Sequence, residues 1–246
     1  MTKMNRSLPL CLLLSACAGT TTQPGHDDAF YTLPGLDHGL IQSPINILSA
    51  HLETPRQHRV HLHFNDHFRA VENLGHTVQV DFTPGSDIQF DDQRYAFKQL
   101  HFHTPAEHLI DGVTYPMEMH LVSYQAPEQP AQPPRYLVIA VLFKMGASNA
   151  FIQEVLNNTP QQAQHTQPIL HDSVHLHDLF LASMPEDFNR YYHYQGSLTT
   201  PPYTESVEWL VLKTILTASP EQIEAINRIE GNNARHIQAE HGRAVD

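Results

Sequence analysis

The sequence predicts a mainly β fold in a single domain. Short β-rich runs recur along the chain, and each either alternates apolar with polar residues or runs apolar throughout. Long stretches with helical periodicity are rare. The chain has 246 residues and contains no Gly/Ser-rich linker or internal repeat that would mark a boundary between two domains.

Turn residues separate the β-rich runs and set the limits of the expected strands. The expected strands are Val60 to Phe64, Thr77 to Phe82, Leu100 to His103, Met117 to Tyr124, Tyr136 to Phe143 and Val207 to Leu216. Pro127 to Pro134 contains four prolines and is expected to be a loop.

Two short helices are expected. The first covers Ala150 to Asn157, after the capping residues Ser148 and Asn149. The second covers Pro220 to Arg228. It follows Ser219 as N-cap, with proline at the first helical position and Gln222 three residues after the cap, the pattern of a capping box.

A histidine cluster lies in the third and fourth expected strands. Residues i and i+2 of a strand project from the same face, so His101 and His103 share one face, and His120 can join them from the next strand. Asp111-Gly112 and Pro116 between the strands allow the chain to turn back. Three histidines leave one ligand position of a zinc ion to water, which is typical of catalytic rather than structural zinc.

Spacing alone does not single out this cluster, because the chain has 19 histidines and two further His-x-His pairs, His61 with His63 and His175 with His177. Metal-bound imidazoles usually donate their second N–H to an acceptor. Gln99 and Glu118 each precede a proposed ligand by two residues and are expected to orient it. Since the other two pairs lack this arrangement, we interpret them as structural.

The first residues are typical of an export signal. Lys3 and Arg6 precede an apolar run from Leu8 to Leu14 that is too short to span a bilayer as a mature helix. Leu14-Ser15-Ala16-Cys17 resembles a bacterial lipobox, which predicts a signal peptide over residues 1–16 and acylation of Cys17. Residues 17–29 would be the lipidated N-terminus and tether. The alternative is an ordinary signal peptide cut between Ala18 and Gly25.

Cysteine content and charge restrict the class of the mature protein. The mature domain is expected to fold in the periplasm, anchored to the outer membrane. The chain has only one cysteine besides Cys17, and because this residue, Cys11, lies in the removed segment, no disulfide is expected. Removal of residues 1–16 leaves 12 basic and 26 acidic residues, a net charge of −14 with neutral histidines. Nucleic acid is therefore not expected as a partner, because phosphate binding needs a positive surface.

Further motifs resemble the α-class carbonic anhydrases, in order and with similar spacing from about Gln42 to Arg243. They are Gln42-Ser43-Pro44-Ile45-Asn46-Ile47, Asn73-Leu74-Gly75-His76, Glu107-His108, Tyr194-Gln195-Gly196-Ser197-Leu198-Thr199-Thr200-Pro201-Pro202 and Val207-Glu208-Trp209. The resemblance implies one domain, residues 30–246, on a large, twisted, mixed β-sheet with short peripheral helices. It also implies reversible hydration of CO2 to bicarbonate and a proton by zinc-bound hydroxide, and inhibition by sulfonamides or anions.

The resemblance also implies roles for individual residues. His101, His103 and His120 would be the zinc ligands, and Gln99 and Glu118 their orienting partners. Thr199 would accept a hydrogen bond from the zinc hydroxide and donate its own to Glu107, since an ionised carboxylate can only accept. His76 would relay the released proton. The substrate pocket would be formed by Val122, Val138, Leu198, Thr200, Val207 and Trp209.

The chain departs from the family pattern in three places. The aromatic N-terminal segment of the family is missing, and Tyr31 is the candidate for the tyrosine that supports the Thr199 network. A disulfide common in bacterial relatives would join the positions of Leu36 and Tyr203, which hold no cysteine here. Leu74 replaces an asparagine beside the proton relay, so fewer polar groups would order water near His76.

Two other functions compete with this prediction. A catalytically weak or silent relative would use the same fold as a zinc-binding module, but such relatives lose a ligand, and all three histidines, Glu107 and Thr199 are present. A periplasmic zinc-storage protein would carry exchangeable histidines in a mobile tract, whereas these histidines are distributed through strands. Incidental esterase activity is expected from the same zinc chemistry.

Overall fold

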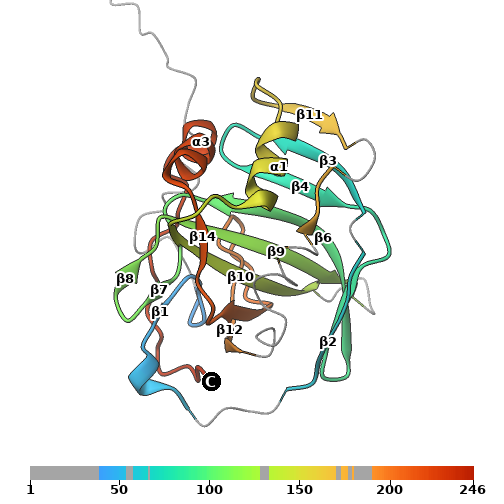
Figure 1. The fold of residues 1–246 in the computed structure, drawn as a ribbon. Coiled ribbons are helices and arrows are strands. Elements are labelled where there is room, and N and C mark those ends of the chain that lie inside the picture. Colours follow the sequence, from blue (N-terminus) through green and yellow to red (C-terminus); the bar gives the residue numbers. More distant parts are fainter. Residues whose placement is uncertain are drawn as a thin grey trace, which may run out of the picture.

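The computed structural model describes residues 39–53, 58–65, 67–127, 133–169, 173–176, 179 and 190–246 (Figure 1). The predicted signal peptide, the tether and the predicted start of the domain at residue 30 lie outside these residues. Among the helices of the described ranges, none combines the length and the apolar character needed to cross a membrane.

An eleven-stranded mixed sheet forms the body of the molecule (Figure 1). Its main path runs in the order β11-β3-β4-β6-β9-β10-β13-β12, with β14 pairing to β10, and β5 pairing to both β2 and β6. The strands are β2 (Val60–His63), β3 (Phe68–Asn73), β4 (Val78–Phe82), β5 (Asp87–Phe90), β6 (Gln93–His103), β9 (Met117–Gln125), β10 (Arg135–Met145), β11 (His165–Pro168), β12 (Tyr191–Gly196), β13 (Val207–Leu212) and β14 (Leu216–Ala218).

Neighbouring strands of this sheet are antiparallel except where β10 meets β13 and β14, which run parallel to it. A small second sheet has the order β1-β7-β8. Its strands are β1 (Asn46–Ile47), β7 (Leu109–Ile110) and β8 (Val113–Thr114), and a short 3-10 helix, η2, covers Ser49–His51. The mainly β, mixed-sheet fold predicted from the sequence is confirmed.

The central strand β10 is buried on both faces and separates two hydrophobic clusters. Leu137 and Ile139 belong to the larger cluster, whereas Val138 and Ala140 belong to the smaller one, as the alternation of side chains along a strand requires. A continuous apolar sequence is typical of a strand covered on both faces. The larger cluster lies under the helices, and the smaller cluster lies on the opposite face.

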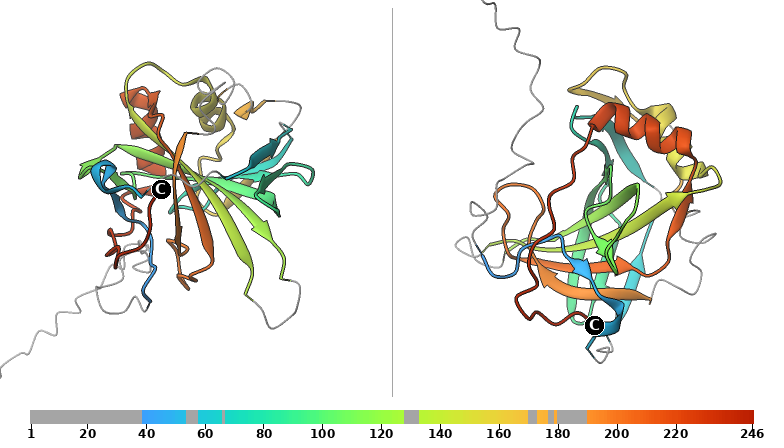
Figure 2. Two further views of the ribbon diagram at one scale, coloured as in Figure 1. Left: turned by 90° about the horizontal axis from the view of Figure 1, so that it is seen from below. Right: turned by 90° about the vertical axis from the view of Figure 1, so that its left-hand side faces the viewer.

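Helices α1 (Ala150–Asn158) and α3 (Pro220–Glu230) lie on the same side of the sheet (Figure 2). Both helices contribute to the larger cluster. Asn149 caps α1 by accepting a hydrogen bond from the backbone N–H of Ile152, and Ser219 with Gln222 forms a capping box at α3. Both helix predictions are confirmed, with ends one and two residues later than expected.

The remaining differences from the expected strands have local causes. The run Val207 to Leu216 forms two strands, β13 and β14, which pair with different parts of β10. Strand β3 was not expected. Its pairing with β4 shifts register between Phe68 and Ala70, and this irregularity breaks the alternation by which a strand is recognised. Strands β1, β5, β7, β8, β11 and β12 were also not expected, and each is six residues or fewer.

Candidate metal centre and cleft

A cleft of about 480 Å³ opens on the face of the sheet opposite the helices. Strands β4, β6, β9, β10 and β13 contribute to its walls, together with loops at residues 74–77 and 198–201. The lining residues are Leu74, His76, Thr77, Gln79, Gln99, His101, His103, His120, Val122, Tyr136, Val138, Leu198, Thr199, Thr200, Pro201, Trp209 and Asn233.

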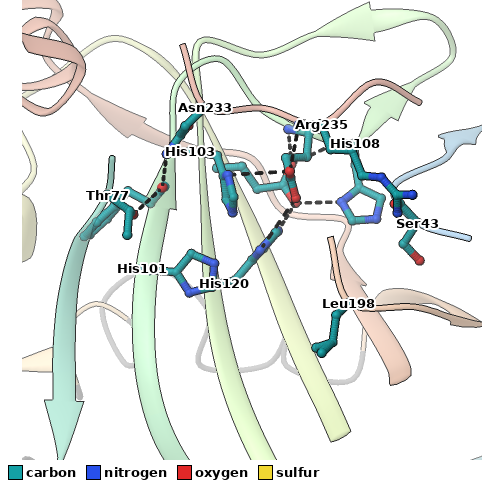
Figure 3. A network of polar contacts seen from close by, with 12 residues as sticks. Ser43, Thr77, His101, His103, His108, His120, Leu198, Asn233 and Arg235 are labelled. Carbon is teal, nitrogen blue, oxygen red and sulfur yellow. Dashed lines mark hydrogen bonds and ion pairs between the residues drawn. The ribbon is translucent and has the colours of Figure 1, made fainter. Parts of the chain in front are cut away.

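The three predicted ligands meet in this cleft (Figure 3). His101 on β6 is the Cα partner of His120 on β9. The ring centroids of His101 and His103 are 4.9 Å apart, and that of His120 lies 5.2 and 4.6 Å from them. One nitrogen of each ring lies within 4.8 Å of the corresponding nitrogens of the other two.

Polar partners hold two of these rings in defined orientations. Nδ1 of His101 lies 2.9 Å from Oε1 of Gln99, and Nε2 of His120 lies 2.6 Å from Oε1 of Glu118. Since Gln99 and Glu118 accept from these nitrogens, Nε2 of His101 and Nδ1 of His120 are left for the cleft. Both nitrogens of buried His103 lack a hydrogen-bond partner among the described residues.

Burial keeps the three imidazoles in their neutral form. It lowers the pKa of His103 from 6.5 to about 4, and it lowers the pKa of His101 well below 6.5 with a contribution from the neighbouring histidines. The pKa of His120 is lowered by burial as well, although Glu118 opposes the shift. Neutral imidazole is the form that binds metal ions.

Glu118 is the centre of the buried hydrogen-bond network behind the histidines. Its Oε2 accepts from the backbone N–H groups of Glu107 and His108 at 2.9 and 2.8 Å, and its Oε1 accepts from the rings of His108 and His120. Burial acts to raise the pKa of Glu118, but the interactions with His108 and His120 outweigh it and hold the pKa well below 4.5. Glu118 is therefore an ionised acceptor.

The sequence reasoning assigned no role to His108, and it sought the supporting tyrosine at Tyr31, outside the described residues. In the structure the hydroxyl of Tyr194 lies 2.6 Å from Nε2 of His108 and 3.1 Å from Oγ of Ser43. His108 thus connects Glu118 to a tyrosine from β12. Both residues lie in motifs that resemble the family, but spacing could not predict their contact because it joins segments 86 positions apart.

Glu107 and Thr199 are close together at the edge of the cleft. Glu107 is buried, its Oε1 accepts from the backbone N–H of Arg235 at 2.9 Å, and its Oε2 has no hydrogen-bond partner among the described residues. Burial raises the pKa of Glu107 to about 7, and the hydroxyl of Thr199 is among the groups that oppose this shift. A nearby cation would also favour the ionised form.

The side chain of Arg235 fixes the loop whose backbone N–H, that of Arg235 itself, donates to Glu107. Its guanidinium donates to the carbonyl of Ser43 at 2.6 Å and to Oε1 of Gln42 at 2.9 Å. It also lies 3.8 Å from the centroid of the Tyr203 ring. In this structure a cation–π contact therefore occupies the position of the family cysteine at Tyr203, while Leu36 lies outside the described residues.

His76 lines the cleft beside Leu74, as the sequence predicted for the relay position. Asn233 fixes its backbone, because the Asn233 side-chain amide donates to the carbonyls of His76 and Phe102 at 2.9 and 3.0 Å. The end of β6 and the loop carrying His76 are thereby joined. Asn233 is a cleft residue that the sequence reasoning missed.

The predicted substrate pocket lies almost entirely in the cleft. Five of its six residues are among the lining residues: Val122, Val138, Leu198, Thr200 and Trp209. Val207 is not among them and packs in the smaller hydrophobic cluster with Trp209. Figure 3 shows Leu198 to the lower right of the histidines, in the wall of the same cleft.

The other His-x-His pairs do not form comparable clusters. His61 is exposed, and the side chain of His63 is 70% exposed beside Asp87. His175 lies 3.1 Å from Glu154 on α1, and His177 lies outside the described residues.

Two observations test whether a metal ion fits the three-histidine cluster. The rings are neutral, buried and oriented by acceptors, and both nitrogens of His103 lack hydrogen-bond partners within the described part of the chain. A buried imidazole without a partner is costly unless another group binds it. The fold and the site therefore define a β-sheet protein whose partly apolar cleft contains a cluster of three histidines suited to a metal ion.

Comparison with known proteins gives the family. Residues 33–246 match the model of the eukaryotic-type carbonic anhydrases. A carbonic anhydrase of Pectobacterium carotovorum is 33% identical over 98% of this chain and 99% of its own, and one of Neisseria gonorrhoeae is 36% identical over 84% and 77%. The solved α-carbonic anhydrase of Thermovibrio ammonificans, in complex with sulfanilamide, superimposes with a TM-score of 0.75 at 32% identity, covering 84% of this chain and 87% of that one.

The chain belongs to the eukaryotic-type, or α-class, carbonic anhydrase family. The predicted family and class of enzyme are thereby confirmed. The individual site residues stay predictions that the contacts above support.

Proposed function

We propose that this protein catalyses the reversible hydration of CO2 to bicarbonate and a proton, with a zinc ion held by His101, His103 and His120. The observation that carries the proposal is the convergence of three neutral histidines at the base of a cleft whose other wall is apolar. A zinc ion in this position would act as a Lewis acid and make water acidic enough to ionise near neutral pH.

Thr199 and Glu107 would set the direction of the attack on CO2. An ionised carboxylate only accepts hydrogen bonds, so a Thr199 hydroxyl that faces Glu107 must donate to it. The lone pairs of the Thr199 oxygen would then be directed into the cleft, where they could accept a hydrogen bond from the attacking group. The backbone N–H of Arg235 holds Glu107, which would keep this arrangement in place before substrate binds.

The apolar residues of the cleft suit a substrate that offers no strong hydrogen-bonding group. Val122, Val138, Leu198 and Trp209 surround the space beside the histidines. CO2 would bind there by burial of apolar surface, while charged bicarbonate would leave readily. His76, which lines the cleft just before β4, would carry the released proton toward solvent.

The proposal extends to inhibitors. The Thermovibrio ammonificans relative was solved with sulfanilamide, and we expect sulfonamides and small anions to bind this protein at the same histidine cluster.

Stopped-flow hydration of CO2 by the purified, zinc-loaded protein tests the proposal. Chelation should abolish activity, added zinc should restore it, and a sulfonamide should inhibit it. His120→Ala should lose zinc and activity together, because β6 already contributes both of its inward histidines. The exposed His61→Ala is the matched control. Stoichiometric zinc without hydration would favour the catalytically silent alternative, and full activity of His120→Ala would refute the ligand assignment.

We further propose that the protein is exported, acylated at Cys17 and held at the outer membrane facing the periplasm. The supporting observation is the sequence of residues 1–17, with its basic start, short apolar run and lipobox-like end. Residues 17–29 would then connect the lipid to the domain.

A further inference from the structure

A second group of metal-binding side chains lies on the other face of the sheet from the cleft. It consists of His58, just before β2, His193 on β12, and Asp246. Trp209 of β13 lines the cleft, and its neighbour Glu208 points to the opposite face, where it contacts His193. The group is therefore separate from the three-histidine cluster.

Both imidazoles are held from behind by a carboxylate. Nδ1 of His58 lies 2.8 Å from Oδ2 of Asp91, and Nε2 of His193 lies 2.9 Å from Oε2 of Glu208. In each ring the nitrogen that remains faces Asp246. A histidine that donates one N–H to a carboxylate and presents its other nitrogen to a shared point is typical of metal ligation, because the carboxylate fixes the ring and raises its basicity.

One of the inward nitrogens lacks a hydrogen bond within the part of the chain that the structure describes. Nε2 of His58 is buried and has no hydrogen-bond partner among the described residues. The nearest oxygen of Asp246, Oδ2, is 3.9 Å away, which is too far for a hydrogen bond. Phe90 stacks on the His58 ring with centroids 4.5 Å apart and covers it from one side. Such an orphaned nitrogen is unfavourable unless a further group binds it.

The distances suit a small divalent ion. Zinc bonds to nitrogen and oxygen of about 2.0 to 2.2 Å place the ligand atoms of a tetrahedral site about 3.3 to 3.6 Å apart. Nδ1 of His193 lies 3.0 Å from Oδ1 of Asp246, and Nε2 of His58 lies 3.9 Å from Oδ2. These values fall on either side of the required separation. The side chains of His58, His193 and Asp246 are only 12%, 8% and 6% exposed.

We propose that His58, His193 and Asp246 form a second zinc-binding site, which fastens Asp246 to β12 and to the segment before β2. Two imidazoles and one carboxylate are a donor set that zinc accepts, and the fourth position is left to water. The backbone supports the same connection, since His193 and Asp246 exchange hydrogen bonds of 2.9 and 3.1 Å between their N–H and C=O groups. The ion would join segments far apart in the sequence, and its expected effect is on stability.

Equilibrium dialysis of the full chain against zinc, followed by metal analysis, tests the site. The wild-type protein should retain one more zinc ion per chain than His58→Gln. His61→Gln, an exposed histidine on β2, is the matched control and should retain the wild-type amount. Asp246→Asn keeps an acceptor for His193 but is a weaker ligand, so it should also lose the additional ion. This second variant tests the site even if His58→Gln folds poorly.

A second measurement separates this site from the cleft. Thermal unfolding of the wild-type protein should shift upward when zinc is added beyond the amount that restores CO2 hydration, and the shift should be absent in Asp246→Asn. Hydration activity should be the same in both. Equal zinc content in wild type, His58→Gln and Asp246→Asn would overturn the proposal and leave a hydrogen-bonded network without metal.

Discussion

His101 lies directly opposite His120 in the pairing of β6 with β9, and this register depends on one extra residue in β6. Phe97 pairs with Ser123, but Gln99 pairs with the adjacent Val122, so Lys98 is a β-bulge. Before the bulge, Tyr95 and Phe97 face the larger hydrophobic cluster. Without the bulge, strict alternation would send Gln99, His101 and His103 to that same face, away from the cleft.

Glu118→Gln should weaken zinc binding by about 10- to 100-fold, the usual effect of removing a partner that orients a metal ligand. Oε1 of Glu118 accepts from the rings of His108 and His120, and Oε2 accepts from two backbone N–H groups, so the NH2 group of a glutamine would face N–H donors in either orientation. Zinc affinity should be measured by competition with a chelator. Glu224→Gln, an exposed acid on α3, is the control. Unaltered affinity would show that Glu118 does not orient His120.

Thr199→Ala should retain zinc and lower the turnover number on the order of a hundredfold, because a preorganised hydrogen-bonding group is lost while the three histidines stay. Thr199→Ser keeps the hydroxyl and should recover most of the activity. Metal analysis and stopped-flow hydration distinguish the outcomes. Zinc loss in Thr199→Ala would instead mean that Thr199 maintains the structure of the metal centre.

His76→Ala should lower turnover in dilute buffer, and added imidazole should restore it, since a small mobile base can replace a lost proton relay. The defect should be modest because Leu74 lines the same part of the cleft and offers no polar group to order water. The measurement is the turnover number as a function of buffer concentration. Equal rates of wild type and variant at low buffer would show that protons leave by another route.

Glu230→Gln should change how stability depends on pH. Glu230 is buried at the end of α3, where its Oε1 is 2.9 Å from the hydroxyl of Thr104, and burial raises its pKa well above 4.5. The folded state therefore binds the proton more tightly than the unfolded state does. The contribution of protonated Glu230 to the free energy of unfolding is complete below 4.5, the pKa of the unfolded state. This contribution is lost as the pH rises through the pKa of Glu230 in the folded state.

Glutamine does not titrate, so the stability of Glu230→Gln relative to wild type should improve as the pH is raised above 4.5. Urea unfolding at several pH values measures this difference. Glu224→Gln on the same helix, 66% exposed, should follow the wild-type curve. Parallel curves for Glu230→Gln and wild type would mean that Glu230 is ionised in the folded state.

Cys17→Ser should abolish acylation and release the protein from the membrane without changing its specific activity, because the proposed anchor lies outside the catalytic domain. Fractionation of cells and incorporation of labelled palmitate provide the measurements. Label in the variant, or membrane retention equal to wild type, would contradict acylation at Cys17.

Local features of the sequence were sufficient for the elements that local chemistry decides. Asn149 and Ser219 predicted both helix starts, because a cap acts on backbone N–H groups within three residues. Gln99 and Glu118 were found for the same reason, since residues i and i+2 of a strand share a face. The ordered motifs from Gln42 onward predicted the family, and with it the mixed sheet.

Tertiary structure decided which distant segments complete the sites. Neither the Lys98 bulge nor the contact of His108 with Tyr194 has a signature in spacing, because each depends on pairing between strands. His58, His193 and Asp246 are separated by more than fifty positions at each step, and only the folded sheet brings them together. Sequence by itself determined the residue types and their local orientation, whereas long-range packing determined their partners, since side-chain periodicity carries no information on which strands become neighbours.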